Sequence, residues 1–186
     1  MAVTTPRLQG KRIVILSEVG MHEHEFWVPY YRFKEEGATV KVAGIKKGVV
    51  HRSEGTGGMD GGNLARTDMT IKDVRPSAWD ALIIPGGIYG PMILREYEPL
   101  LHLVREMDRK KMIIAAICHG PWVLISAGVL KGRLATASRD IVVDIVNAGA
   151  RYSGPGAVRD GNLVTGEYFG ELPAFMKLLL AAIEEA

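Results

Sequence analysis

Short apolar runs alternate with longer amphipathic segments along most of this chain of 186 residues. The continuous apolar runs at residues 13–16, 81–84 and 112–117 are typical of strands buried on both faces of a parallel sheet. Residues 25–36 carry aromatic side chains at helical spacing, and this helix is expected to end at Gly37. The alternation predicts an α/β protein, in which helices form a sandwich around a mostly parallel sheet.

The same patterns predict the other elements. A glycine-rich stretch at residues 44–62 is expected to form loops or a short hairpin outside the main sheet, and an Asp-Gly pair indicates a tight hairpin turn further on. The predicted elements are strands at 11–17, 39–43, 81–84, 112–117 and 134–137, helices at 25–36, 94–107, 121–127, 140–147 and 171–185, and a hairpin at 158–164.

Ligands of such sheets bind beyond the carboxyl ends of the strands. In this chain three predicted strand ends carry unusual residues, at 17–25, 85–87 and 118–120. Because these strands should be neighbours, we expect the three segments to converge on one site.

Length and composition predict a single domain over residues 1–186, with residues 1–10 as a flexible tail. The net charge is only +2 and Lys and Arg are dispersed among Asp and Glu, so no nucleic-acid partner is expected. No segment approaches the roughly 18 apolar residues that span a membrane, and the amino terminus lacks a signal-peptide pattern. With its single cysteine, the chain is therefore expected to lie in the reducing cytoplasm, without a membrane partner.

Cys118 stands where the apolar run at residues 112–117 ends and a tight turn begins. Gly120 and Pro121 are expected to begin a helix, since an early helical proline loses no useful N–H group. The thiol would then lie at the amino end of a helix, where N–H groups and the helix dipole favour a thiolate. The sequence therefore predicts a nucleophile that is ionised near neutral pH.

A nucleophilic cysteine needs N–H groups that hold the negative charge formed on attack. Gly86 and Gly87 follow the strand expected beside that of Cys118, and glycine N–H groups can approach a bound oxygen closely. With the N–H of His119, and with Gly120 in the same turn, they are predicted to form an oxyanion hole that binds the substrate. Pro-Gly-Gly is also an ordinary turn signal, so this prediction depends on its coupling to Cys118.

Three side chains are candidates for moving protons. Glu25 opens the first helix, where burial would raise its pKa and let it donate a hydrogen bond to sulfur; a solvated acid that stabilises the helix dipole is the alternative. His119 adjoins the nucleophile and could activate it, although neighbours at a turn often point apart. His22 is predicted to help Glu25. Alternating His and Glu at residues 22–25 do not make a metal-binding face, so neither a metal nor a cofactor is expected.

Residues 84–87 (Ile-Pro-Gly-Gly), 116–121 (Ala-Ile-Cys-His-Gly-Pro) and 124–133 resemble the ThiJ/PfpI superfamily, and residues 29–37 resemble its PfpI branch. The resemblance implies a glutamine-amidotransferase-like, flavodoxin-like three-layer sandwich with Cys118 at a nucleophile elbow. It also implies that Glu25 is a partner carboxylate and that the chain forms a homodimer or a larger homo-oligomer. Members of the superfamily are described as cysteine peptidases, as cofactor-independent glyoxalases or deglycases, and as stress or redox proteins, and the fold decides among none of these.

The chain departs from the peptidase-type pattern of this superfamily. Residues 91–92 are Pro-Met where those relatives carry a glutamate that reaches the histidine across a subunit interface. His22 replaces an acidic residue, Ser138 replaces a tyrosine, and residues 165–167 also differ. Without an orienting carboxylate His119 would be a weaker base, and a peptide leaving group needs strong acid assistance. The peptidase triad is therefore not expected.

Addition of a thiolate to an aldehyde is less demanding, because no poor leaving group must depart. The sequence therefore predicts an enzyme in which Cys118 adds to a small carbonyl substrate such as a 2-oxoaldehyde. The N–H groups of Gly87 and His119 hold the oxyanion and Glu25 moves the proton in this prediction. Two alternatives stay open: an intracellular cysteine peptidase or amidohydrolase, and a redox-sensing or chaperone-like stress protein.

Overall fold

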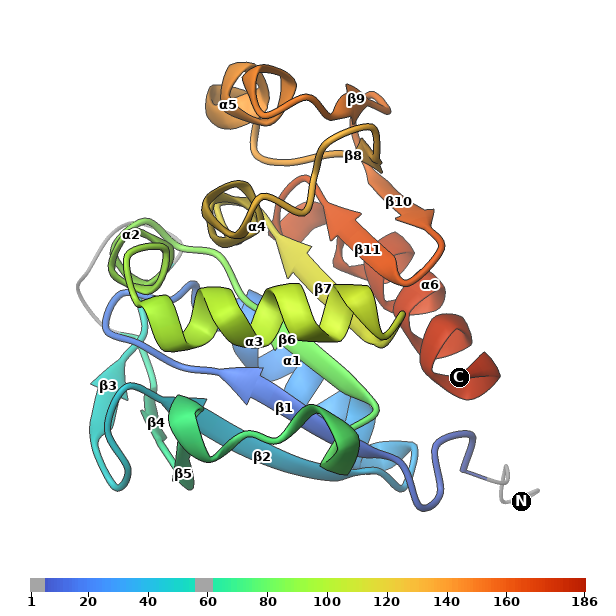
Figure 1. Ribbon diagram of the computed structural model, residues 1–186. Coiled ribbons are helices and arrows are strands. Elements are labelled where there is room, and N and C mark those ends of the chain that lie inside the picture. The colour runs from blue at the N-terminus through green and yellow to red at the C-terminus, as the bar shows by residue number, and fades with distance from the viewer. Residues whose placement is uncertain (1–5, 56–61) are drawn as a thin grey trace.

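The computed structural model describes residues 6–55 and 62–186, and these form a three-layer α/β sandwich (Figure 1). The seven-stranded sheet found among these residues has the order β10-β11-β7-β6-β1-β2-β5. Paired strands are parallel except β10 and β11, which form the predicted hairpin. The order is that of a flavodoxin-like sheet, so the predicted fold class is confirmed.

The bounds of the elements follow the predictions closely. The strands of the main sheet are β1 (Arg12–Leu16), β2 (Thr39–Gly44), β5 (Met69–Thr70), β6 (Ala81–Ile84), β7 (Ile113–Ile117), β10 (Ala157–Asp160) and β11 (Leu163–Gly166). Two small sheets pair β3 (Val50–Arg52) with β4 (Leu64–Arg66), and β8 (Leu134–Ala135) with β9 (Arg151–Tyr152). The helices are α1 (Glu23–Glu35), α2 (Tyr89–Leu94), α3 (Glu98–Arg109), α4 (Pro121–Ala127), α5 (Val142–Asn147) and α6 (Leu172–Glu185), with 3₁₀ turns η1 (Ile71–Asp73), η2 (Pro76–Ala78), η3 (Arg139–Ile141) and η4 (Phe169–Glu171).

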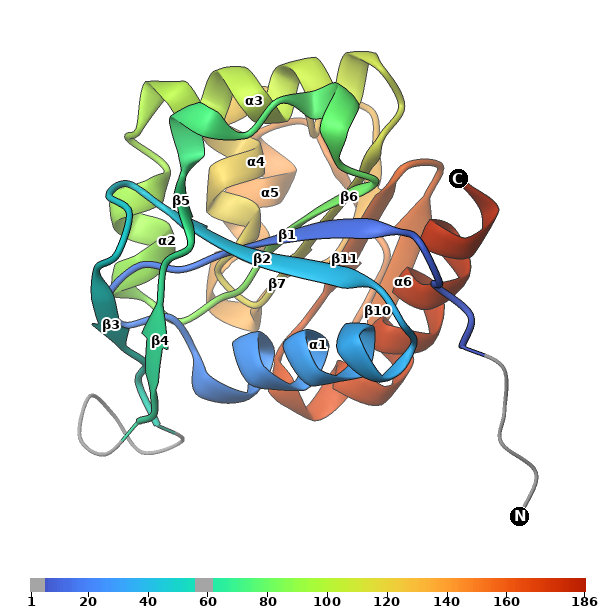
Figure 2. The ribbon, with the colours of Figure 1, turned by 90° about the horizontal axis from the view of Figure 1, so that it is seen from below.

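Helices cover both faces of the sheet, which explains the continuous apolar runs of the strands. Figure 2 shows α3 and α4 over one face and α1 and α6 against the other. Along β1, Val14 and Leu16 belong to the first of the two hydrophobic clusters, whereas Ile13 and Ile15 belong to the second. Both sets are fully buried, because successive side chains of a strand point to opposite faces.

Two predicted boundaries are wrong. The helix expected at residues 94–107 begins later, as α3 at Glu98, and the separate helix α2 ends at Leu94. Pro99 lies in the first turn of α3, where its missing N–H group is tolerated, whereas a helix continuous from Leu94 would lose a hydrogen bond there. The flexible tail expected at residues 1–10 does not include Leu8. Leu8 is fully buried, and its N–H donates to the carbonyl oxygen of Glu36 at 2.8 Å. The first five residues lie outside the described part.

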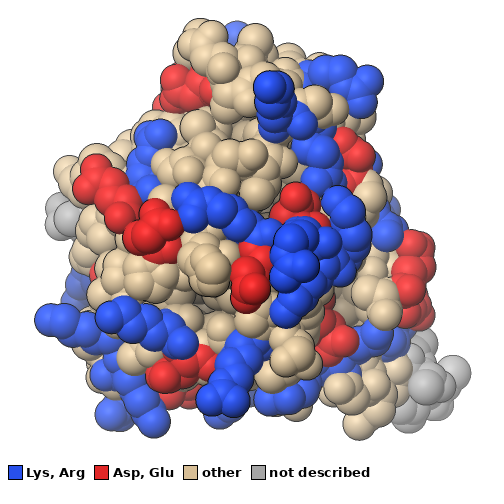
Figure 3. Space-filling model, viewed as in Figure 1, with Lys and Arg blue, Asp and Glu red and all other residues tan. Residues whose placement is uncertain are grey.

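The glycine-rich stretch lies outside the main sheet, as predicted, with β3 and β4 paired as an antiparallel hairpin; its residues 56–61 fall outside the description. On the face shown in Figure 3, positive and negative side chains are intermixed. Ion pairs among the described residues include those of Arg105 with Glu98 and of Arg133 with Asp108. No helix among the described residues is long and apolar enough to cross a membrane.

Replacement of Leu8 by alanine is expected to lower the free energy of unfolding by about 2–4 kcal/mol, because it leaves a cavity in the core. Urea denaturation measures the change. The matched control is L64A, since Leu64 is 54% exposed and its truncation should cost less than about 0.5 kcal/mol. Equal losses of unfolding free energy for L8A and L64A would contradict the packing of Leu8 in the core.

Candidate active site

Cys118 lies in the sharp turn between β7 and α4, with a backbone φ of 61° in the left-handed region. Residues with a Cβ seldom adopt this conformation, and here backbone hydrogen bonds hold it. The N–H of Cys118 donates to the carbonyl of Gly166 at 3.0 Å, and the N–H of Gly120 donates to that of Ile117 at 2.8 Å. The N–H of Ser138 donates to the carbonyl of Cys118 at 3.0 Å. The turn thus forms the predicted nucleophile elbow.

Glu25 reaches the sulfur from the first turn of α1. Its side chain is fully buried, and its Oε2 accepts a hydrogen bond from the N–H of Gly86 at 2.9 Å. A Cβ at position 86 would lie 2.5 Å from both the Cβ of Cys118 and Oε2 of Glu25. Glycine is therefore required at this position, because the thiol and the carboxyl group pack on either side of it.

Burial raises the pKa of Glu25 to about 8, and hydrogen bonds from Gly86, Cys118 and Phe169 lower it only in part. Its Oε1 has no partner at ordinary hydrogen-bond geometry among the described residues. Glu25 is thus a buried acid that carries a proton at neutral pH, and the solvated alternative considered from the sequence does not occur.

The prediction of a resting thiolate is wrong. Burial raises the pKa of Cys118 well above its usual range, and the nearby Glu25 raises it further. The N–H groups of Gly87 and His119 point at the sulfur and lower this pKa, but they do not compensate for desolvation. Helix α4 has only seven residues and begins three residues beyond the thiol, at Pro121. Its dipole therefore lowers the pKa of the thiol only weakly. The thiol needs a base to become a nucleophile.

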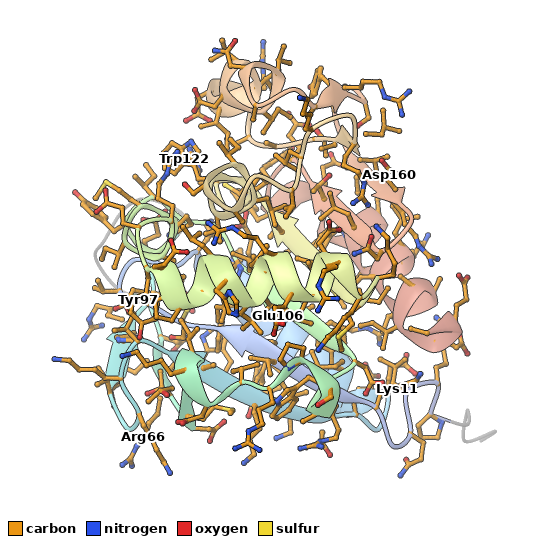
Figure 4. The ribbon with its side chains drawn as sticks, viewed as in Figure 1. Lys11, Arg66, Tyr97, Glu106, Trp122 and Asp160 are labelled. Carbon is orange, nitrogen blue, oxygen red and sulfur yellow. The ribbon has the colours of Figure 1, made fainter. Side chains whose placement is uncertain are left out.

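His119 is placed to be that base. Its Nδ1 lies 3.2 Å from Sγ of Cys118, although the two residues are neighbours in the chain. Its Nε2 lies 2.8 Å from Oδ2 of Asp140, which comes from η3. The ring also packs against Trp122 on α4, with centroids 4.8 Å apart; Trp122 is labelled in Figure 4. A cysteine, a histidine and a carboxylate therefore form a continuous chain within one molecule.

The acid that appeared to be missing is therefore Asp140. Burial acts to raise its pKa, but hydrogen bonds from Ser138 and His119 hold the pKa below its usual value. Sequence reasoning looked for this acid at residues 91–92, after the Pro-Gly-Gly turn. The only available signal was an acidic residue at the start of the helix predicted at residues 140–147, in the segment that follows the cysteine helix.

Only part of the predicted oxyanion hole is available. The N–H groups of Gly87 and His119 converge on the sulfur. Those of Gly86 and Gly120 are used elsewhere, because they donate to Glu25 and to Ile117. Gly86 and Gly120 therefore shape the site without being donors to a substrate oxygen.

The help that His22 was predicted to give Glu25 stays a prediction, and the structure shows only how the ring is placed. Its ring stacks on Phe169 with centroids 4.8 Å apart, and its Nδ1 has no hydrogen-bond partner among the described residues. Burial, with His24 nearby, lowers the pKa of His22 to about 4, so the ring is neutral at physiological pH and cannot readily take up a proton. Its backbone matters more, because its N–H donates to the carbonyl of Gly86 at 3.0 Å.

Sequence reasoning also missed Glu54, which follows β3 in the glycine-rich stretch. Burial raises the pKa of its carboxyl group, whereas the N–H of Ile88 and the nearby His119 lower it. Glu54 in turn raises the pKa of Glu25. A third carboxyl group therefore lies within electrostatic reach of the site, and no motif in the sequence indicated it.

A second buried cluster joins Ser17, His51 and Glu18. Oγ of Ser17 lies 3.1 Å from Nδ1 of His51, and Nε2 of His51 lies 3.2 Å from Oε1 of Glu18. Ser17 is only 1% exposed, so its hydroxyl is closed to a substrate and the cluster links β3 to the end of β1. Across the described ranges, no three His, Cys, Asp or Glu side chains meet in a way that could hold a metal ion.

The chain matches the family model of the DJ-1/PfpI family over residues 11–182. It is 38% identical over 166 residues to deglycase PfpI of Pyrococcus furiosus, a match that covers 89% of this chain and 95% of the relative. It is 34% identical over 167 residues to protein/nucleic acid deglycase 2 of Escherichia coli, covering 89% and 94%. A crystal structure of a two-domain protein from Anabaena variabilis, with DJ-1/ThiJ/PfpI-like and ferritin-like domains, matches with a TM-score of 0.84 and 33% identity over 92% of this chain and 47% of that chain.

The raised pKa of Glu25 predicts a specific pH dependence of stability. Because the pKa rises from 4.5 to about 8 on folding, the stabilising contribution is full below the lower value and is lost as the pH rises through the upper one. E25Q cannot ionise at this position. The free energy of unfolding of the wild type should therefore fall by a few kcal/mol relative to that of E25Q over this pH range, at about 1.4 kcal/mol per pKa unit.

Denaturation of both proteins across this pH range measures the difference. The control is E35Q, because the side chain of Glu35 on the same helix is 66% exposed, and its stability should follow the wild type at every pH. A constant gap between E25Q and the wild type would contradict the raised pKa.

Proposed function

Because this chain belongs to the DJ-1/PfpI family and surrounds one cysteine with a base, a buried acid and two N–H donors, we propose that it is a cysteine-dependent glyoxalase or deglycase. Its substrates are small reactive carbonyl compounds, and its role is protection against them. The observation that carries the proposal is the position of Sγ of Cys118, 3.2 Å from Nδ1 of His119 and beside the protonated Glu25. The similarity to relatives named deglycases supports it.

The reaction begins with proton transfer from the thiol of Cys118 to Nδ1 of His119. Asp140 accepts the hydrogen bond from Nε2 and stabilises the imidazolium that forms. The thiolate adds to the aldehyde carbon of a 2-oxoaldehyde, and the new alkoxide accepts hydrogen bonds from the N–H groups of Gly87 and His119. These donors are already directed at the sulfur, so they need not reorganise.

Glu25 then carries protons between neighbouring substrate atoms. It gives its proton to the alkoxide, and as a carboxylate it removes the proton of the aldehyde carbon and delivers it to the adjacent carbon. The oxygen on that adjacent carbon takes up the proton that His119 received from the thiol, and the hydroxyl on the sulfur-bearing carbon returns its proton to Glu25. The product is a thioester of a 2-hydroxy acid, which water hydrolyses with the now neutral His119 as the base. A pKa of about 8 suits a group that both gives and takes protons near neutral pH.

A second candidate function is hydrolysis of peptides or amides, and the hydrogen bond between His119 and Asp140 favours it. This bond supplies the orienting carboxylate whose apparent absence argued against the peptidase alternative. An acyl-transfer enzyme still needs an acid for a poor leaving group. The redox-sensing alternative is less favoured, because burial raises the pKa of Cys118 and the thiolate is the form that peroxides oxidise.

The proposal extends to the setting of the enzyme. Each step uses side chains of this chain and water, so no cofactor is included, and neither nucleic acid nor membrane is a partner. The free thiol suits a reducing compartment, so we place the enzyme in the cytoplasm. We retain the homodimer or larger homo-oligomer that the family resemblance implies.

Replacement of Cys118 by serine should reduce conversion of methylglyoxal to lactate to the rate without enzyme, because the nucleophile is lost. Assay of lactate formation by the purified protein measures this rate, with S126A, in the last turn of α4, as a control that should match the wild type. If the wild type leaves methylglyoxal untouched but cleaves unstructured peptides through Cys118, the second candidate function is the correct one.

Replacement of Asp140 by asparagine should lower kcat at least about 10-fold and leave KM nearly unchanged, because Asp140 acts through His119 and not on the substrate. The conservative variant D140E should restore part of the loss. The matched control is D144N, since Asp144 accepts a hydrogen bond from Trp122 and is not bonded to His119. Equal kcat values for D140N and D144N would remove Asp140 from the mechanism.

A further inference from the structure

The backbone of Glu54 is fixed to the loop that leads into α1. The N–H of Glu54 donates to the carbonyl of Met21 at 2.9 Å, and the N–H of Glu23 donates to the carbonyl of Glu54 at 3.1 Å. Between these two bonds, Glu54 pairs with His22 as a parallel β-bridge. Glu54 is therefore held to the same loop that positions Glu25, and the two carboxyl groups approach the site from adjoining segments.

The side chain of Glu54 is directed toward the site. Its carboxyl group accepts a hydrogen bond from the N–H of Ile88, the residue next to the oxyanion donor Gly87. It is close enough to His119 and to Glu25 for their charges to interact. The carboxyl group of Glu54 therefore lies beside the Gly87 turn, within electrostatic reach of His119 and Glu25.

Glu54 differs from Glu25 in its access to water. Glu25 is fully buried, whereas Glu54 is only partly buried. Burial nevertheless raises the pKa of Glu54, which favours a proton on this group nearer to neutral pH. Such a carboxyl group can give a proton to a substrate and recover one from solvent, which Glu25 cannot do directly.

One step in deglycation needs such a group. A free 2-oxoaldehyde has no leaving group, and Cys118, His119 and Glu25 are sufficient for its conversion. An amine adduct of the same aldehyde must first lose its nitrogen, and an amine leaves poorly unless it takes up a proton. Glu25 is fully buried and holds the proton that the later alkoxide needs, whereas Glu54 is only partly buried and can recover a proton from solvent, so Glu54 is the better placed acid for the amine.

We propose that Glu54 is a catalytic acid that releases the amine from an aminocarbinol, the adduct of an amine with a 2-oxoaldehyde. The C–N bond breaks, its electron pair goes to nitrogen, and the nitrogen takes the proton of Glu54. The carbinol hydroxyl then loses its proton to the Glu54 carboxylate, which leaves the free aldehyde for Cys118. Atoms and charge balance, and nothing is oxidised or reduced. The inference rests on the proposed function and assigns to Glu54 the step that separates an amine adduct from the free aldehyde.

The test compares E54Q with the wild type on three substrates: free methylglyoxal, its preformed adduct with N-acetyl-lysine, and its adduct with N-acetylcysteine. Gln at this position can still accept the hydrogen bond from Ile88, so the fold should persist, and thermal unfolding checks this. We expect kcat/KM for the lysine adduct to fall by about 10²-fold. Free methylglyoxal has no leaving group, so its kcat/KM should stay within about twofold of the wild type, and the thiol adduct should lie in between, because a thiol leaves more readily than an amine.

Direct measurement of amine release, with the spontaneous rate subtracted, separates the outcomes. E23Q is the control, because Glu23 is the first residue of α1, beside the segment of Glu54, and its carboxylate accepts a hydrogen bond from Asn63, so this variant should follow the wild type on all substrates. Equal losses on all three substrates, or no loss, would overturn the role of Glu54.

Amine release at the spontaneous rate by a wild type that consumes methylglyoxal would overturn the inference alone. A wild type inactive on all three substrates would overturn the proposed function. If E54Q unfolds, E54D takes its place, and the same selective loss is expected because its carboxyl group no longer reaches the adduct.

Discussion

The packing of a carboxyl group against a thiol, with room only for glycine between them, controls the chemistry of this site. Any Cβ at position 86 would lie 2.5 Å from Oε2 of Glu25 and from Cβ of Cys118. Because this packing removes both groups from water, neither is ionised at rest. The negative charge on sulfur must therefore be created during the reaction. The surrounding N–H donors stabilise negative charge, and the neighbouring acid and base groups transfer the proton.

The protons of the site are handled by groups with different access to solvent. Glu25 is closed to water and can only exchange protons with the sulfur or a bound substrate. His119 is also buried, but its hydrogen bond leads to Asp140, whose side chain is 63% exposed. The cysteine therefore lies between an isolated acid and a base that connects to solvent, an arrangement that suits proton transfer within a substrate.

Most of the fold could be predicted from the sequence, because the periodicity of apolar positions directly reflects burial. The run at residues 13–16 is apolar throughout since both faces of β1 are covered, and Cys118 could be placed at a strand end from the turn residues after it. The split between α2 and α3 was also available in principle, since Pro99 stands inside the helix that was predicted. These features depend on local chain chemistry, which a single sequence contains.

The site could be predicted only in part, because its electrostatics depend on distant segments. Asp140 reaches His119 from beyond β8, and Glu54 comes from a stretch without a periodic pattern. The ionisation of Cys118 was predicted wrongly for a related reason. An argument from the local sequence includes the dipole of α4, which lowers the pKa of the thiol. The larger effect on this pKa is desolvation, which comes from the packing of α1 and the Gly86 turn around the sulfur.

The hydrogen bond between His119 and Asp140 has a consequence for how such a molecule can diverge. Both residues belong to one polypeptide, so the base and its orienting acid are inherited and folded together. Mutations that strengthen, weaken or rearrange association between copies then leave the base with its carboxylate. Quaternary structure is thereby free to change, while the catalytic unit stays whole in each single chain.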